Sequence, residues 1–113
     1  MADLAEKLQV KEDGIRVLNA PDDVALDLPA PSGANEGVLV FVRTAADVEA
    51  HAEPALDAAR ADLLAWIAYP KGGQLETDLD RDRLWELIEG ESVRPVRQVA
   101  IDGTWSALRF RPE

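Results

Sequence analysis

The chain has 113 residues, 47% of them hydrophobic, and this size predicts a single domain with one core. The net charge is −10, from 22 acidic and 12 basic residues, which argues against nucleic acid as a partner because phosphate binding needs a basic face. Cysteine is absent, which excludes disulfides and thiolate chemistry, and the charged start and short apolar runs predict a soluble cytoplasmic protein without a signal peptide or contact with a membrane.

The start of the chain predicts a short helix followed by a strand. Leu4 and Leu8 are spaced as on one face of a helix, which we place at residues 2–9. Residues 15–20, IRVLNA, are rich in strand formers, and Pro21 ends that strand.

Two later strands are apolar along their whole length. A helical turn at 22–28 and a loop at 29–37 lead to VLVFV at 38–42, and LLAWIAY follows at 63–69. Strands of this kind are buried on both faces, which is typical of parallel sheets.

Two helices accompany these strands. Thr44 caps a helix over 45–60, and Pro54 must kink or restart it because proline lacks a backbone donor. Thr77 is the expected cap of a second helix, over 78–89.

The end of the chain predicts a β-hairpin from residues 95–101 and 105–111, which flank Asp102 and Gly103. With those two residues at the centre of the turn, Ile101 pairs with Thr104. One buried face then carries four side chains, Val99, Ile101, Leu108 and Phe110. Gly103 needs positive φ in such a turn, so we expect Gly103→Val to be strongly destabilising.

The order of these elements predicts an α/β fold, a five-stranded and mostly parallel Rossmann-like sheet with a C-terminal β-hairpin. The segments RVLNAP, VLVFV, WIAYPKGG, TDLDRDRLWELI and VRQVAIDGTWSALRFRP resemble a family of small uncharacterised bacterial proteins classed as a domain of unknown function. The resemblance covers most of the chain, is most specific from Trp66 to Pro112, and implies a fold without an established activity.

The architecture also resembles the later half of a class I S-adenosylmethionine methyltransferase core. That resemblance implies the spatial strand order 15–20, 38–43, 63–69, 105–111, 95–101, with the last strand in sequence inserted antiparallel. The place of the Gly-rich cofactor loop holds NAPDDVALDLPAP, which has no glycine. We therefore expect no cofactor and no binding of S-adenosylmethionine, since fold alone does not imply function.

Open α/β sheets keep their ligands outside the carboxyl ends of the parallel strands. The candidate ligand or partner rim there consists of Asn19, Arg43, Tyr69, Lys71, Gly72, Gly73, Thr77, Asp102 and Trp105. Lys71 and the two glycines after it suggest a site for a small anion, because glycines let backbone N–H groups approach. The alternative is an ordinary flexible loop with a solvated lysine. The spacing is not that of a P-loop.

Catalytic and metal sites are not predicted. Asp78, Asp80 and Asp82 partly resemble a calcium loop, but its glycine and closing glutamate are missing, and aspartates favour a first helical turn in any case. His51, the only histidine, lies in an Ala/Glu-rich helix far from any nucleophile. A catalytic set therefore cannot be assembled.

The charge is uneven along the chain. The last twenty residues carry four arginines, Arg94, Arg97, Arg109 and Arg111, against two acids. A mildly basic terminal hairpin on an acidic body is therefore expected, with ordinary strand-surface charge as the alternative reading.

Topology predicts one poorly covered face of the sheet. Right-handed crossovers place residues 22–28, 45–60 and 78–89 on the same face, which leaves only the helix at 2–9 for the other. We expect that second face or the adjoining edge to bind a second copy or another protein, unless residues 1–14 and the 29–37 loop cover it. The function favoured is a non-catalytic binding or protein-interaction module. The alternatives are a small ligand-binding protein or enzyme that uses the rim around Lys71 and Asp102, and a regulatory subunit of a bacterial complex.

Overall fold

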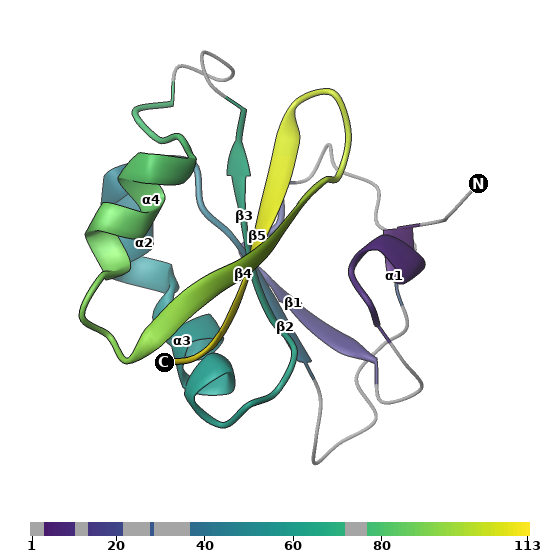
Figure 1. The fold of residues 1–113 in the computed structure, drawn as a ribbon. Coiled ribbons are helices and arrows are strands. Elements are labelled where there is room, and N and C mark those ends of the chain that lie inside the picture. The colour runs from purple at the N-terminus through teal and green to yellow at the C-terminus, as the bar shows by residue number, and fades with distance from the viewer. Residues whose placement is uncertain (1–3, 11–13, 22–27, 29–36, 72–76) are drawn as a thin grey trace.

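The computed structural model describes residues 4–10, 14–21, 28, 37–71 and 77–113, which form one five-stranded sheet with helices on its two faces (Figure 1). The strands are β1 (Ile15–Leu18), β2 (Gly37–Phe41), β3 (Ala65–Pro70), β4 (Val93–Ala100) and β5 (Trp105–Pro112). The helices are α1 (Leu4–Lys7), α2 (Ala45–His51), α3 (Glu53–Arg60) and α4 (Arg81–Ile88).

The strand order is β1-β2-β3-β5-β4. Strands β1, β2 and β3 are parallel, and β5 lies antiparallel between β3 and β4. The predicted α/β class, the five-stranded sheet and its spatial order are therefore confirmed.

Two layers of apolar side chains flank the sheet. Helices α2, α3 and α4 cover one face, and α1 lies on the other (Figure 1). The helix-side core contains Val40, Ile67, Leu84, Ile88 and Phe110, among others. The α1-side core consists of Leu8, Ile15, Leu39, Phe41, Trp66, Ala68, Trp105 and Ala107. Successive residues of β2 and β3 enter opposite cores, which explains why both strands are apolar at every position.

The helix boundaries follow their caps. Thr44 caps α2 by accepting a hydrogen bond from the Asp47 backbone N–H, as predicted. The expected restart at Pro54 is confirmed, because α2 ends at His51 and α3 begins at Glu53. The predicted start of α4 is wrong, because the helix begins at Arg81 and not at residue 78.

Asp80, not Thr77, caps α4, and its side chain accepts from the Arg83 backbone N–H. Thr77 instead accepts from the Leu79 N–H in the segment before the helix. Both residue types are good caps, so propensity alone did not choose between them.

The predicted register of β4 and β5 is wrong by one residue. Val99 pairs with Ala107, and the Ile101 N–H donates to the Trp105 carbonyl, so three residues rather than two connect the strands. The cause is the Asp102 side chain, whose Oδ1 accepts from the N–H groups of Thr104 and Trp105 at 2.8 Å each. This bonding pattern is an Asx turn, which occupies one residue more.

The new register moves side chains to other faces. Val99 and Ile101 pack with Trp105 and Ala107 in the α1-side core, whereas Leu108 and Phe110 belong to the helix-side core. The four residues predicted to share one face are therefore divided between two. Gly103 does not adopt positive φ, and a Cβ placed on it meets open space, so the reason for expecting Gly103→Val to be severe is contradicted.

The α1-side face is covered within the chain, contrary to the expectation of an exposed apolar surface. Leu39, Phe41, Trp66 and Trp105 are at most 3% exposed. Leu4, Val10 and Leu28 pack against that core, while most of the predicted turn at 22–28 and loop at 29–37 lies outside the described residues. Within the described ranges, Val96 is the one large hydrophobic side chain counted as exposed, at 40%.

Val96 marks an irregularity in the edge strand β4. The pairing with β5 shifts between Pro95 and Arg97, so Val96 is the extra residue of a β-bulge. In the portion of the chain that the structure describes, no helix is long and apolar enough to cross a membrane.

Candidate functional site

A cavity of about 260 Å³ lies where β1 and β2 end and β5 begins. Its described lining residues are Asn19, Pro21, Phe41, Val42, Arg43, Asp47 and Trp105. The cavity is thus at the carboxyl ends of parallel strands, the position that α/β sheets use for ligands.

Two aromatic rings from distant parts of the chain form an apolar wall of this cavity. Phe41 ends β2 and Trp105 begins β5, and their ring centroids are 5.1 Å apart with an interplanar angle of 71°. This edge-to-face arrangement is a favourable geometry for aromatic pairs. Both rings are buried, so the wall is held in place by the α1-side core.

Asn19 closes the β1 side of the cavity. It has φ of 60°, a left-handed conformation that asparagine adopts more readily than most residues. Its Nδ2 donates to the Phe41 carbonyl at 2.8 Å, which ties the end of β1 to the end of β2. The side chain thereby positions the chain at the cavity mouth.

The start of α2 supplies the charged side of the mouth. Asp47 Oδ2 accepts from the Arg43 backbone N–H at 2.9 Å, and the Asp47 N–H donates to Thr44. The segment before α4 supports this turn, because Asp78 Oδ1 accepts from Ala45 N–H and the Thr77 hydroxyl donates to the Arg43 carbonyl. These bonds fix the backbone of Arg43 beside the Asp47 carboxylate, and both residues line the cavity.

The structure brings three of the predicted rim residues together at this cavity, Asn19, Arg43 and Trp105. Sequence reasoning did not place Phe41 and Asp47 in the site. Phe41 was assigned to a buried strand, and Asp47 lies in the first turn of the helix predicted to start after Thr44. Their position was a signal in both cases, because Phe41 is the last residue of β2 and Asp47 lies six positions after it.

Four other predicted residues are not among the described lining residues. Lys71 pairs with the β4–β5 connection through its backbone, donating to the Thr104 carbonyl at 2.8 Å. Asp102 is occupied by its own turn, and Thr77 by the Arg43 carbonyl. Tyr69 points into the helix-side core. Gly72 and Gly73 lie outside the described residues.

The Tyr69 hydroxyl lies at the end of the helix-side core. It accepts a hydrogen bond from Gln98 Nε2 at 2.8 Å. Burial raises the pKa of Tyr69 above its ordinary value of 10.0, Arg81 lowers it, and Asp80 and Asp82 raise it further. The neutral phenol is therefore favoured in the folded protein.

Titration of Tyr69 can be observed directly, because it is the only tyrosine of the chain. We expect the phenolate absorption of the folded protein to appear at higher pH than that of the protein in denaturant, and Asp82→Asn to lower the folded midpoint. The raised pKa contributes stability below the unfolded pKa, and this contribution is lost as the pH rises towards the folded pKa. Identical midpoints with and without denaturant would contradict the burial of this hydroxyl.

The aspartates considered for calcium have structural roles instead. Asp78 binds the start of α2, Asp80 caps α4, and Asp82 is exposed in the first turn of α4. His51 is exposed at the end of α2. Across the described ranges, no group of three or more histidine or acidic side chains is arranged to hold a metal ion.

The chain has been compared with known families, with curated proteins and with solved structures. No family model matches it, and no curated protein or solved structure does so either, which leaves the cavity's own chemistry as the guide to function.

Proposed function

We propose that this protein is a non-catalytic binding module whose strand-end cavity holds a small ligand with an apolar part and a polar end. The supporting observation is the cavity itself, where a buried aromatic wall of Phe41 and Trp105 faces the polar side chains of Asn19, Arg43 and Asp47. An apolar wall with a few convergent polar groups is the usual composition of small-molecule sites.

The scaffold proposed for this site is a degenerate Rossmann-like nucleotide fold that ends in a C-terminal β-hairpin. Its support is the parallel β1-β2-β3 series, with β5 inserted antiparallel and the cavity at the carboxyl ends. The sequence after β1 lacks the glycines of a dinucleotide loop, which argues for a ligand other than a dinucleotide.

The size and polarity of the cavity narrow the ligand class. A volume of about 260 Å³ is slightly below the roughly 300–1,000 Å³ of sites for drug-sized ligands. The ligand is therefore a small molecule with a planar apolar part for the aromatic wall. Its polar end carries a carboxylate for Arg43, because a guanidinium binds carboxylates through parallel hydrogen bonds.

Binding is favoured over catalysis because the polar groups at the mouth already have structural roles. The Asp47 carboxylate accepts a hydrogen bond from the Arg43 backbone N–H, and the Asn19 side chain connects the end of β1 to the end of β2 through the Phe41 carbonyl. A general base needs a carboxylate or imidazole within hydrogen-bond reach of the ligand and oriented by a further group. Asp47 is instead engaged by the backbone of its own helix start.

The proposal is tested by a thermal-shift screen with small aromatic carboxylates and with nucleotides. We expect at least one aromatic carboxylate to raise the melting temperature, since a ligand at a hundredfold excess over its dissociation constant stabilises by about 2.7 kcal/mol. Arg43→Gln should abolish the shift, and Arg83→Gln, an exposed arginine on α4, should retain it.

Two outcomes would contradict this function. One is the absence of a shift across the whole screen. The other is an equal shift in the Arg43 and Arg83 variants, which would place binding elsewhere. A shift caused by nucleotides alone would reassign the ligand class while keeping the cavity as the site.

A further inference from the structure

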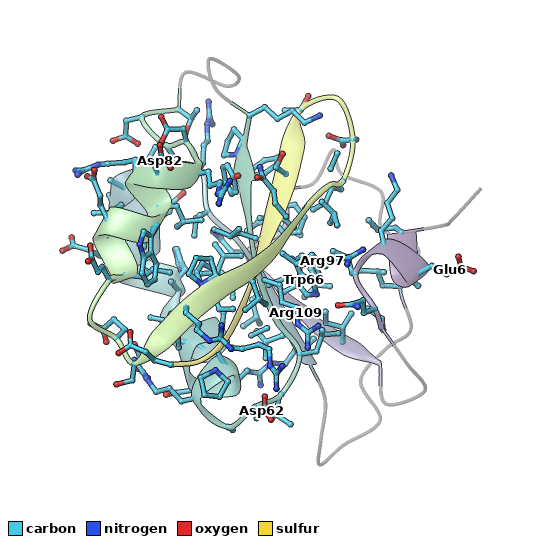
Figure 2. The ribbon with its side chains drawn as sticks, in the orientation of Figure 1. Glu6, Asp62, Trp66, Asp82, Arg97 and Arg109 are labelled. Carbon is cyan, nitrogen blue, oxygen red and sulfur yellow. The ribbon has the colours of Figure 1, made fainter. Side chains whose placement is uncertain are left out.

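Four arginines gather on one face of the sheet, far from the cavity along the strands. The register pairs Arg97 with Arg109 and Arg94 with Arg111 across β4 and β5. Val99 and Ala107, two residues from Arg97 and Arg109, belong to the α1-side core, and side chains two apart share a face. We call these four residues the arginine face. Figure 2 shows Arg97 and Arg109 on the side of β4 towards α1.

This arrangement is electrostatically unfavourable by itself. Side chains directly opposite each other in an antiparallel pair have Cβ atoms about 4.5–5.5 Å apart, and like charges there are destabilising. The arginine face contains two such pairs in succession, on a protein whose net charge is −10. The overall amino-acid composition, which is acidic, therefore does not explain why four arginines lie together.

The contacts within the chain neutralise little of this charge. Asp62 Oδ1 accepts from Arg111 Nε at 3.3 Å and from Arg111 Nη2 at 3.2 Å. Arg94 Nε donates to the Pro112 carbonyl, and Arg109 donates to the Gln9 side-chain oxygen, both of which are neutral acceptors. The Arg97 side chain has no hydrogen-bond or ion-pair partner among the described residues, although its backbone is part of the β4–β5 ladder. Within that part of the chain, the one ion pair made by these four guanidinium groups is that of Arg111 with Asp62.

Arg109 is the member of the arginine face whose charge is least well stabilised by its surroundings. Its Nε is buried and has no hydrogen-bond partner within the described residues. Burial lowers the pKa of Arg109, Arg111 and Arg97 lower it further, and Asp62 opposes them. A cation held under these conditions favours the arrival of an anion, which offsets the repulsion between neighbouring guanidinium groups.

The Asp62 carboxylate is an oxyanion that is already bound to this face, through Arg111. It lies in the turn between α3 and β3 with φ of 60°, and its side chain is 59% exposed. An exposed ion pair of this kind contributes little to stability, so an incoming anion can displace the carboxylate.

We propose that the arginine face binds a phosphate group, held by Arg97, Arg109 and Arg111, and that Asp62 leaves Arg111 when the phosphate binds. A phosphate is favoured over a single carboxylate because it carries up to two charges and enough oxygens for several guanidinium forks at once. The site is separate from the cavity, because Arg109 is four residues from Trp105, or about 13 Å along an extended strand.

Isothermal titration with inorganic phosphate and with pyrophosphate, at low ionic strength, tests this site. We expect millimolar or tighter binding by the parent, a loss of tenfold or more in Arg97→Gln, and a severalfold gain in Asp62→Asn. Asparagine tolerates positive φ, so the Asp62 variant preserves the turn while removing the competing charge. Arg16→Gln and Arg83→Gln remove exposed arginines elsewhere and should leave the affinity unchanged.

Several results would overturn the inference. Absence of phosphate and pyrophosphate binding by the parent would do so, as would equal losses in Arg97→Gln and Arg16→Gln. An affinity in Asp62→Asn no tighter than in the parent would reject the displacement of Asp62. Binding of a glutamate-rich peptide without phosphate binding would assign the face to a protein partner instead. Arg43→Gln should retain phosphate binding, so failure of the cavity proposal leaves this test intact.

Discussion

Replacement of Trp66 with alanine is expected to destabilise the protein by about 3–5 kcal/mol, the range for removing a large aromatic side chain from a core. The indole is fully buried in β3, and its Nε1–H donates to the Leu8 carbonyl at 2.8 Å. Alanine would therefore leave a cavity in the α1-side core and remove a bond between the sheet and Leu8, the residue that follows α1. Small domains have about 5–15 kcal/mol of stability in total, so this one change removes a large share. Urea unfolding followed by circular dichroism measures the loss.

Two control variants separate packing from the hydrogen bond. Trp66→Phe retains much of the apolar volume but leaves the Leu8 carbonyl without its donor, so we expect a smaller loss. Trp85→Ala removes a half-buried indole from α4 and should also cost less than Trp66→Ala. A Trp66→Ala variant within about 0.5 kcal/mol of the parent, as for typical surface substitutions, would contradict the burial of this residue.

Gly37→Ala is the second substitution with a large expected effect, about 1–3 kcal/mol from overpacking. Gly37 begins β2, and a Cβ built on it lies 2.9 Å from both the Cβ and the carbonyl oxygen of Leu64. The clash includes backbone, which cannot move aside as a flexible side chain does. The Leu64 carbonyl also accepts from Val38 N–H at 2.8 Å, so its displacement would strain the β2–β3 pairing.

Gly103→Ala is the matched control for this prediction. Neither glycine adopts positive φ, so the two variants differ in available space rather than in backbone conformation. A Cβ at Gly103 meets no atom within 4 Å, and we expect a change near zero. Thermal melting of the two variants side by side checks the comparison, and equal melting temperatures would show that β2 relaxes around the new methyl group.

The two central strands and their burial on both faces followed from apolar patterns in the sequence, whereas the spatial order of the five strands was implied only by the methyltransferase resemblance. VLVFV and LLAWIAY are apolar on both sides of the pleat, and a parallel sheet between two cores is the arrangement that buries both. The restart at Pro54 was equally readable, since a missing N–H has the same consequence in any helix.

The length of the β4–β5 turn could not be predicted from the sequence, because it depends on the hydrogen bonds of one side chain. The Asp-Gly pair before Thr104 suits a two-residue turn, yet the Asp102 carboxylate binds two backbone N–H groups and lengthens the connection. One residue of register then reversed the faces assigned to Val99 and Ile101. Propensity does not tell which of two competing hydrogen-bond patterns is formed.

The candidate site was predicted in its position but only in part in its members. The rule for strand ends led to Asn19, Arg43 and Trp105, because each directly follows or precedes an identifiable strand. It also selected Lys71 and Asp102, which are near the same end but outside the described lining of the cavity. The contribution of Phe41 depends on the ring contact with Trp105, and such a contact across 64 positions leaves no local pattern in the sequence.

The β-bulge at Val96 has a consequence for behaviour at high concentration. Strand β4 has eight residues and lies at the end of the sheet, where an unbroken backbone would present a template for another chain. Pro95 lacks an N–H, the bulge interrupts the regular spacing of donors and acceptors, and Arg94 and Arg97 add charge on either side. Hydrogen-bonded pairing of β4 with an edge strand of another molecule is thereby disfavoured. This edge of the sheet is therefore protected against fibril growth.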